Sequence, residues 1–241
     1  MEGRLKGRSV LVTGASAGIG RATALALARA GADVLVTGRR RAELEEVAAL
    51  CSRGGGGGRF LQGDLTDRDF VRKLALEAGE VDVLVNNAGI LTYAPIRDAS
   101  LDDCEAMFRA NVVAAFAVAR EIALGMMERR RGHLVFVTSL SARNVNPMAA
   151  SYAATKHALS AYAKGFRVEL KSYGIKVTEV APGMVDTHIR DGSTHPEVVG
   201  AIAARKFEPL SPDDVAEAIV YAVATREGCC PDLIELRPTD S

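Results

Sequence analysis

Short, continuously apolar runs recur along the chain and alternate with longer stretches of helical periodicity. The runs are rich in valine, leucine and isoleucine. They lack the alternation of apolar and polar positions that a strand with one exposed face would show. Strands buried on both faces have this composition. We therefore predict strands at 9–13, 33–37, 59–62, 81–85, 134–138, 175–180 and 233–236.

The stretches between these runs are rich in alanine and leucine. They predict helices at 18–29, 41–51, 67–77, 102–127, 152–172 and 213–224. Alternating strands and helices are typical of an α/β protein with helices on both faces of a parallel sheet. No domain boundary interrupts the alternation, so we expect residues 1–241 to form a single domain. Five consecutive glycines at 54–58 neither follow a strand nor open a helix, and we interpret them as a flexible surface connection.

The first predicted strand leads into a glycine-rich turn, TGASAGIG at 13–20, and the turn leads into the first predicted helix. Glycine allows a tight turn and lets the backbone approach a pyrophosphate closely. The helix N-terminus adds unpaired N–H groups and the positive end of its dipole. In this setting the turn predicts dinucleotide binding and a Rossmann-like, doubly wound sheet. A plain tight turn is the alternative.

The end of the second predicted strand is where dinucleotide-binding proteins distinguish NAD(H) from NADP(H). A carboxylate there would accept hydrogen bonds from a ribose 2′-hydroxyl and repel a 2′-phosphate. The chain reads TGRRR at 37–41, without an acid. Because arginine binds phosphate with two hydrogen bonds, we predict that Arg39, helped by the Ser16 hydroxyl, favours NADP(H). The alternative for Arg39 is a solvated basic residue at a helix start. We interpret Arg40 and Arg41 in this second way.

Tyr152 and Lys156 lie four residues apart at the start of a predicted helix, so both side chains share one helical face. A nearby ammonium lowers the pKa of a phenol from its usual value of about 10, which suits a general acid–base. The YxxxK spacing alone also arises by chance. Ser139, at the end of the fifth predicted strand, strengthens the case, because ligands of parallel sheets bind beyond the carboxyl ends of the strands.

These motifs together resemble the classical short-chain dehydrogenase/reductase family. The TGxxxGxG turn matches the family's cofactor loop, and NNAG at 86–89 follows the fourth strand as in that family. Asp64 stands where the family acid approaches the adenine. Pro182 and Gly183 form the family's turn after the sixth strand, and Thr187 lies four residues beyond Gly183. The resemblance extends over about residues 7–225.

The resemblance implies an oxidoreductase that acts on CH–OH donors with NAD(P). Ser139 would polarise the substrate carbonyl, Tyr152 would donate and accept the proton, and Lys156 would bind the ribose and lower the pKa of Tyr152. Asn111 would anchor a water that links Lys156 to solvent, with a buried, satisfied amide as the alternative. The implied cofactor contacts are Gly14, Ser16, Gly18, Ile19, Gly20, Arg39, Asp64, Asn87, Ala88, Gly89, Tyr152, Lys156, Pro182, Gly183 and Thr187.

Substrate recognition is the least determined part. The polar stretch at 184–210 has the length of a lid loop, and 90–95 and 144–148 are both expected to line the wall opposite it. We interpret His188 as a surface histidine. An ending in Arg-Pro-Thr at 237–239 resembles a branch acting on small hydroxy acids, keto compounds or secondary metabolites. We therefore predict an NADP(H)-dependent oxidoreductase of a small carbonyl or alcohol compound. The alternatives are an NAD-dependent hydroxy-compound dehydrogenase and a non-catalytic dinucleotide sensor.

Composition adds few constraints. Lys plus Arg and Asp plus Glu both number 30, and this balance gives no indication of nucleic acid or a membrane as a partner. The four cysteines lack CxxC spacing and a histidine cluster, so we expect no metal site and ordinary thiols. The start MEGR opens no signal peptide, and no apolar run reaches the ~18 residues of a membrane span, so we expect a cytoplasmic protein. The apolar faces of the helices at 102–127 and 152–172 predict a homodimer or homotetramer, unless they are intramolecular core.

Overall fold

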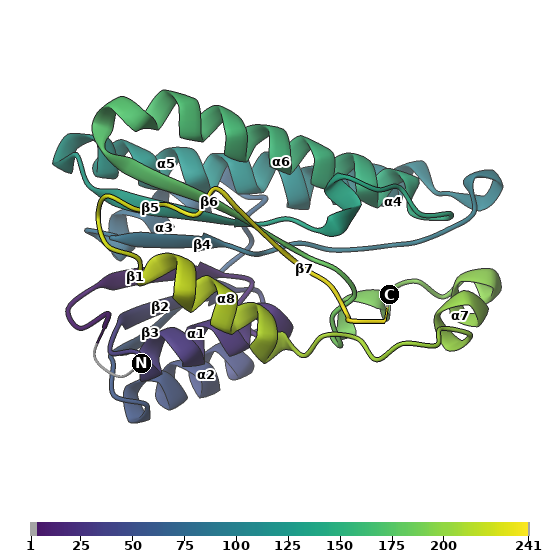
Figure 1. Cartoon of the computed structure of the whole chain (residues 1–241), viewed down its shortest axis with the longest axis horizontal. Helices are drawn as coiled ribbons and strands as arrows, with labels where there is room; N and C mark the ends of the chain where they lie inside the picture. Colours follow the sequence, from purple (N-terminus) through teal and green to yellow (C-terminus); the bar gives the residue numbers. More distant parts are fainter. Residues whose placement is uncertain (1–3, 241) are drawn as a thin grey trace.

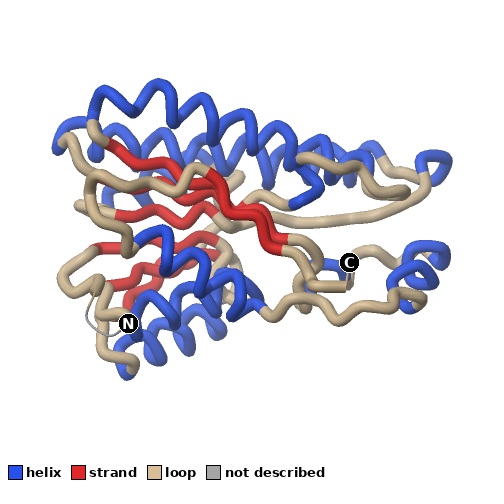
Figure 2. The backbone as a smooth tube through the Cα atoms, in the orientation of Figure 1, coloured by secondary structure: helices blue, strands red, loops and turns tan. Residues whose placement is uncertain are grey.

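The computed structural model describes residues 4–240, so Met1, Glu2, Gly3 and Ser241 lie outside the described residues. Within this range the chain forms one sheet of seven parallel strands in the order β3-β2-β1-β4-β5-β6-β7. The sheet lies between two layers of helices, as Figure 2 shows. The predicted α/β, Rossmann-like doubly wound fold is therefore confirmed.

The strands lie where the apolar runs predicted them, with small shifts at their ends. They are β1 (Ser9–Thr13), β2 (Asp33–Gly38), β3 (Gly58–Gln62), β4 (Val83–Asn86), β5 (Gly132–Val137), β6 (Ile175–Pro182) and β7 (Leu233–Leu236). The helices are α1 (Gly18–Arg29), α2 (Arg41–Arg53), α3 (Arg68–Ala78), α4 (Leu101–Phe108), α5 (Ala115–Arg129), α6 (Ala150–Leu170), α7 (Pro196–Ala203) and α8 (Pro212–Val223). Figure 1 shows α1, α2 and α8 on one face of the sheet and α3, α5 and α6 on the other.

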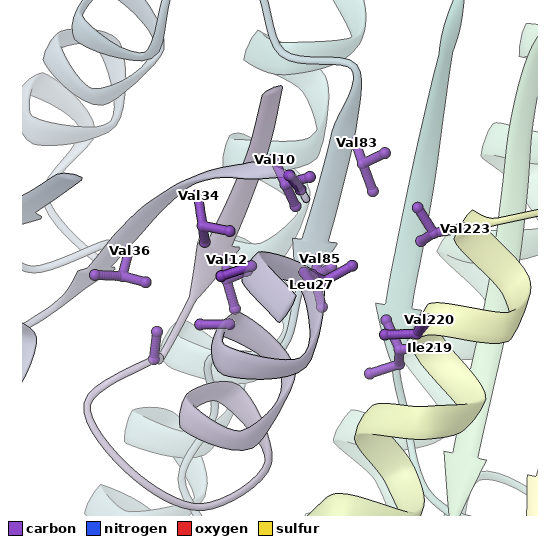
Figure 3. Close-up of a cluster of buried hydrophobic side chains, with 14 of the residues drawn as sticks. Val10, Val12, Leu27, Val34, Val36, Val83, Val85, Ile219, Val220 and Val223 are labelled. Atoms are coloured by element: carbon purple, nitrogen blue, oxygen red, sulfur yellow. The ribbon is translucent and has the colours of Figure 1, made fainter. Parts of the chain in front are cut away.

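The two faces of the sheet carry different apolar side chains. Valines of β1, β2 and β4 point to the layer of α1, α2 and α8, where they pack with Leu27 and Ile219 (Figure 3). Leucines and one phenylalanine from the same region of the sheet point to the opposite layer, and Leu11, Leu84 and Phe136 are fully buried there. Alternate residues of a strand point to opposite faces. Burial on both faces is therefore the reason for the continuously apolar runs.

The single long helix predicted at 102–127 is interrupted. Residues Arg109–Ala114 form a π-helical segment between α4 and α5, with Asn111 inside it. Such segments are rare and often occur at functional sites. The span Leu101–Arg129 is also long and apolar enough to cross a membrane by length and composition, contrary to our expectation, but half of its most apolar window is buried in the protein. A core helix passes the same test, so the finding is weak evidence for a membrane span.

Two connections differ from the sequence expectation. The stretch at 184–210, predicted as a loop, contains α7 and a short 3-10 turn at His188–Arg190. Pro196 at the first turn and the His195 cap explain the start of α7, where the Glu197 N–H donates to His195 Nδ1 at 3.3 Å. Figure 1 shows α7 beyond the end of the sheet, apart from both helical layers.

The glycine run at 54–58 is packed more closely than a flexible connection. A Cβ on Gly56 would lie 1.9 Å from the Ala32 carbonyl oxygen, and one on Gly58 would lie 1.9 Å from that of Ala48. Gly58 is also the first residue of β3, where it pairs with Val34. Two of these glycines therefore allow a close approach of backbone segments that no other residue would permit.

Candidate active site

A cleft of about 710 Å³ opens beyond the carboxyl ends of the strands, next to the junction of β1 and β4. This is where the strand order reverses, which is the usual ligand position in such sheets. The Thr13 hydroxyl fixes the junction, because it accepts hydrogen bonds from the N–H groups of Asn87 and Ala88, both at 3.0 Å. The Asn87 side chain returns a hydrogen bond to the Thr13 carbonyl at 2.9 Å.

The glycine turn leaves room that a side chain would fill. Gly14 has a φ of +64°, and a Cβ there would lie 2.7 Å from the Ala88 Cα. A Cβ on Gly20 would lie 2.4 Å from the Gly14 carbonyl oxygen, and Gly18 faces the Thr187 side chain. The turn thus holds its backbone open toward the cleft at the start of α1. These residues fit a dinucleotide, whose phosphates bind at such a turn.

Most of the predicted cofactor residues line this cleft together. They are Gly14, Ser16, Gly18, Ile19, Arg39, Asp64, Asn87, Ala88, Gly89 and Thr187. Gly20 supports the turn from behind instead, and Pro182 and Gly183 lie at the end of β6, where the Gly183 N–H donates to the Leu236 carbonyl at 2.7 Å. His188, interpreted as a surface histidine, lines the cleft and is also highly exposed.

The adenine end of the cleft is basic. Arg39 lines this end of the cleft. The pKa of Asp64 is lowered mainly by the hydrogen bond that its carboxylate accepts from the Thr66 N–H, and the charge of Arg39 adds a smaller effect. Arg40, which the sequence assigned to the solvated surface, also lines the cleft. Its Nη2 and Nε donate to Ser16 Oγ at 3.1 and 3.3 Å. Arg41 pairs with Glu45 on the exposed helix surface, as expected.

The predicted catalytic residues meet at the carboxyl end of β5. The side chains of Ser139 and Tyr152 are both buried there, and the Ser139 hydroxyl acts to lower the pKa of the Tyr152 phenol. Ser139 Oγ also accepts a hydrogen bond from the Ser141 N–H at 3.0 Å, which fixes its position. Lys156 Nζ lies 5.7 Å from the Tyr152 ring centroid and donates to the Val137 carbonyl at 3.1 Å. The helix α6 therefore brings Tyr152 and Lys156 to the same strand end.

The sequence predicts that Lys156 lowers the pKa of Tyr152, whereas burial has the largest influence on that pKa in this structure. Burial raises the pKa of Tyr152 well above its usual range, and Tyr93 adds to the rise. The hydrogen bond with Ser139 and the charge of Arg190 act in the opposite direction. Burial also lowers the pKa of Lys156 to about 8. The physical reason is common to both groups, because a site closed to water disfavours the charged form of each.

Asn111 holds two parts of the site together. Its Oδ1 accepts from the Ile90 N–H at 2.7 Å, and its Nδ2 donates to the Ile90 carbonyl at 2.8 Å and to Thr155 Oγ1 at 3.1 Å. The side chain is thus satisfied by protein groups, which matches the alternative left open from the sequence. Asn111 Oδ1 and Lys156 Nζ both face the space beside Gly89, within 3.1 and 3.9 Å of a Cβ built there.

The two segments expected to line one wall of the substrate site are joined to each other. The Ala94 N–H donates to the Met148 carbonyl at 3.1 Å, so the segments 90–95 and 144–148 meet beside Tyr152. The Tyr93 ring lies edge-on to the Tyr152 ring, with centroids 5.7 Å apart. Sequence reasoning missed Tyr93 and Arg190. Neither belongs to a motif, and only the folded chain brings them to Tyr152.

Comparisons with known proteins agree with this geometry. A family model described as short chain dehydrogenase matches residues 8–197. An uncharacterized short-chain type dehydrogenase/reductase of Sinorhizobium fredii is 37% identical over 236 residues, covering 95% of this chain and 90% of that protein. The nucleotide-binding fold and the Ser-Tyr-Lys cluster thus define an NAD(P)-binding oxidoreductase. The chain belongs to the short-chain dehydrogenase/reductase family.

Two solved structures extend the comparison. A putative NAD(P) dependent gluconate 5-dehydrogenase from Beutenbergia cavernae, with bound NADP at low occupancy, is 33% identical with a TM-score of 0.84, covering 96% of this chain and 95% of its own. A serine dehydrogenase in complex with NADP+ is 26% identical with a TM-score of 0.87, again covering 96% and 95%. This protein is an oxidoreductase that acts on small CH–OH type substrates.

Proposed function

We propose that this protein is an NADP(H)-dependent oxidoreductase that interconverts a small carbonyl compound and its alcohol. The observation that carries the proposal is the cluster of buried Ser139, Tyr152 and Lys156, which lies beside Gly89 at the cleft that the glycine turn opens. The bound nicotinamide would supply or accept the hydride. The protein would position the substrate and transfer its proton.

The substrate oxygen would lie between the two hydroxyls. Ser139, fixed by the Ser141 N–H, would donate a hydrogen bond to that oxygen and stabilise its developing charge. The neutral Tyr152 hydroxyl would give the proton in reduction and take it back in oxidation. Burial keeps the Tyr152 phenol in its neutral form, which is the form that carries the proton to be donated. Lys156 would bind the ribose and orient the cofactor.

The preference for NADP(H) is supported by the basic end of the cleft. Arg39 lines this end, and Arg40, which also pairs with Glu43, contacts Ser16, so two guanidinium groups and a hydroxyl would be available to a 2′-phosphate. No carboxylate follows Thr37 in β2 to accept a ribose hydroxyl. The gluconate 5-dehydrogenase and serine dehydrogenase structures contain NADP and NADP+, respectively. Arg39 and Arg40 give no such support to the alternative, an NAD-dependent dehydrogenase.

The decisive experiment on catalysis is Tyr152→Phe, assayed by NADPH absorbance with a panel of ketones, aldehydes and hydroxy acids. Turnover should fall by at least about a thousandfold while NADPH binding, measured by fluorescence titration, is retained. Tyr221→Phe, at an exposed position on α8, is the matched control and should leave turnover unchanged. Retained turnover in Tyr152→Phe would refute the proton role. Absence of turnover in the wild type with every compound would favour a dinucleotide sensor.

The cofactor preference is tested by Arg39→Asp and Arg40→Asp. Each should lower kcat/KM for NADPH relative to NADH, because each replaces an attraction to the 2′-phosphate with a repulsion. Arg41→Asp is the control, since Arg41 pairs with Glu45 away from the cleft. An unchanged NADPH/NADH ratio in both variants would overturn the assignment.

We also propose a homo-oligomer, with a cytoplasmic location. The observation behind the assembly is a group of exposed apolar side chains: the rings of Phe116 on α5 and Tyr162 on α6 lie 4.8 Å apart, and Val113, three residues before Phe116, is exposed as well. Exposed apolar patches of this kind mark association sites. Light scattering should give a dimer or tetramer mass, and Phe116→Asp should shift it toward the monomer. A wild-type monomer would overturn the proposal.

A further inference from the structure

Arg190 lies at the end of the short 3-10 turn that follows Thr187. Its Nη1 donates to the Val185 carbonyl at 2.9 Å, and its own carbonyl accepts from the Ser193 N–H at 2.8 Å. Both contacts are with backbone or neighbouring residues of the same segment. The guanidinium is thus held in place by the segment that extends beside the site.

The charge of Arg190 has no acidic partner among residues 4–240. Its neighbour Asp191 pairs with His188 instead, at 3.1 Å. Arg190 Nε is buried and makes no hydrogen bond to any described residue. A buried donor without an acceptor is unfavourable, and for a charged group the penalty is larger. Arg97, in contrast, is paired with Glu197 of α7.

The segment that carries Arg190 packs against the segment that carries Tyr93. Ser193 Oγ is buried and accepts a hydrogen bond from the Tyr93 N–H at 2.9 Å. The Tyr93 ring in turn lies edge-on to that of Tyr152. The positive charge of Arg190 reaches both phenols, since it opposes the rise that burial causes in the pKa of Tyr93 and of Tyr152. The segment that carries this unpaired guanidinium is therefore bonded to Tyr93, which packs against the proposed proton donor Tyr152.

We infer that Arg190 binds an anionic group of the substrate, a carboxylate, so that the substrates are keto acids and their hydroxy acids. This inference rests on the proposed function, because it places the carbonyl at Tyr152 and Ser139. A guanidinium binds a carboxylate with two parallel hydrogen bonds, and its unused Nε–H is one of the donors for such a pair. Leu91 and Met107 also pack against Tyr152. The other cation beside Tyr152 is Lys156, which is bonded to the Val137 carbonyl and is proposed to bind the ribose.

The cofactor pyrophosphate is a second anion that a guanidinium would bind. The glycine turn already provides N–H groups for that pyrophosphate, and Arg39 and Arg40 lie at the adenine end. Arg190 lies beyond Thr187, on the side of Tyr93 and Tyr152. We therefore favour the substrate as the source of the anion. A weaker affinity of Arg190 variants for the cofactor would indicate the pyrophosphate instead.

The test compares matched pairs of a carboxylate and its methyl ester, namely acetoacetate with methyl acetoacetate and levulinate with methyl levulinate. Wild-type enzyme, Arg190→Gln and Arg190→Lys are assayed with NADPH. Arg190→Gln should lower kcat/KM for the acids by at least about tenfold, with little change for the esters, and Arg190→Lys should restore part of the loss. Arg205→Gln, at an exposed position in the same stretch, is the control and should change neither.

Three results would overturn the inference. An equal loss for acids and esters would indicate a general role in shaping the site. An unchanged acid-to-ester ratio would show that no carboxylate binds there. A weaker affinity of Arg190→Gln for NADPH would assign Arg190 to the cofactor. If the wild type reduces none of the four compounds, the proposed function fails for them. Calorimetric titration of levulinate into the NADP+ complex then tests Arg190 independently, and equal affinity in wild type and Arg190→Gln would refute the inference.

Discussion

The Asn111 side chain brackets the backbone of Ile90, with Oδ1 accepting from its N–H at 2.7 Å and Nδ2 donating to its carbonyl at 2.8 Å. Asn111 lies in the π-helical segment between α4 and α5, whereas Ile90 follows the Asn-Asn-Ala-Gly sequence after β4. The same amide reaches Thr155 on α6. One side chain thus ties together a cofactor-binding strand end, a substrate wall and the helix of Tyr152.

Asn111→Ala should therefore destabilise the protein. The change leaves the N–H and carbonyl of Ile90 without partners in a buried place, and we expect a loss of about 2–4 kcal/mol in the free energy of unfolding. Urea titration followed by circular dichroism measures this loss. Asn144→Ala, at an exposed position in the segment 144–148, is the matched control. Equal free energies of unfolding for the two variants would show that the hydrogen bonds between Asn111 and Ile90 do not contribute to stability.

Lys156 predicts a pH dependence of stability in the absence of cofactor. Burial lowers its pKa to about 8, from an ordinary value of 10.5. Between these pH values the unfolded chain holds a proton that the folded protein has released, so the free energy of unfolding should rise with pH in this window. The full rise corresponds to about 3 kcal/mol.

The variant that checks this dependence is Lys156→Met. It should remove the rise above pH 8 and increase stability at pH 7, because no buried charge remains. Lys164→Met, exposed on the same helix, is the control and should keep the rise. Thermal unfolding at pH 7, 8, 9 and 10 measures both. A rise that persists in Lys156→Met would place its origin elsewhere.

His133 predicts a loss of stability in acid. It is buried in β5, where Nε2 contacts Thr178 Oγ1 at 2.8 Å, and burial lowers its pKa to about 3. As pH falls from 6.5 toward 3, the unfolded chain takes up a proton that the folded protein does not, so the free energy of unfolding should fall. The full loss is about 5 kcal/mol at pH 3.

His133→Asn should flatten this acid dependence, even though the lost contact with Thr178 lowers stability at pH 7. His157→Asn, at an exposed position on α6, should leave the slope unchanged. The measurement is the urea midpoint at pH values from 7 to 4. The same slope in His133→Asn as in the wild type would mean that other groups cause acid unfolding.

Gly56 predicts a packing penalty within the glycine run. A Cβ there would lie 1.9 Å from the Ala32 carbonyl oxygen, so Gly56→Ala should destabilise the protein by about 1–3 kcal/mol. Gly165→Ala is the matched control, since nothing lies within 4 Å of a Cβ at that helical position. The control should gain up to about 1 kcal/mol from helix propensity. Equal thermal midpoints for the two variants would support the flexible connection that the sequence suggested.

Much of the site was predictable because it follows strand ends. The glycine turn, Asn87 and Ser139 each come directly after a predicted strand, and the carboxyl ends of parallel strands meet at one edge of the sheet. Tyr152 and Lys156 were found by helical spacing. The spacing did not reveal the burial that raises the pKa of Tyr152 and lowers that of Lys156, and the effect of Lys156 on the pKa of Tyr152 stays a prediction.

The sequence by itself determined the α/β class, the positions of the strands and the cofactor turn, since each depends on local periodicity or on a contiguous motif. Only the tertiary structure decided which distant residues meet. The contact of Arg40 with Ser16, the packing of Tyr93 on Tyr152 and the place of Arg190 join segments that no local pattern links. The physical reason is that the paths of the connecting loops, set by packing and by hydrogen bonds such as Tyr93 N–H to Ser193, bring these side chains together.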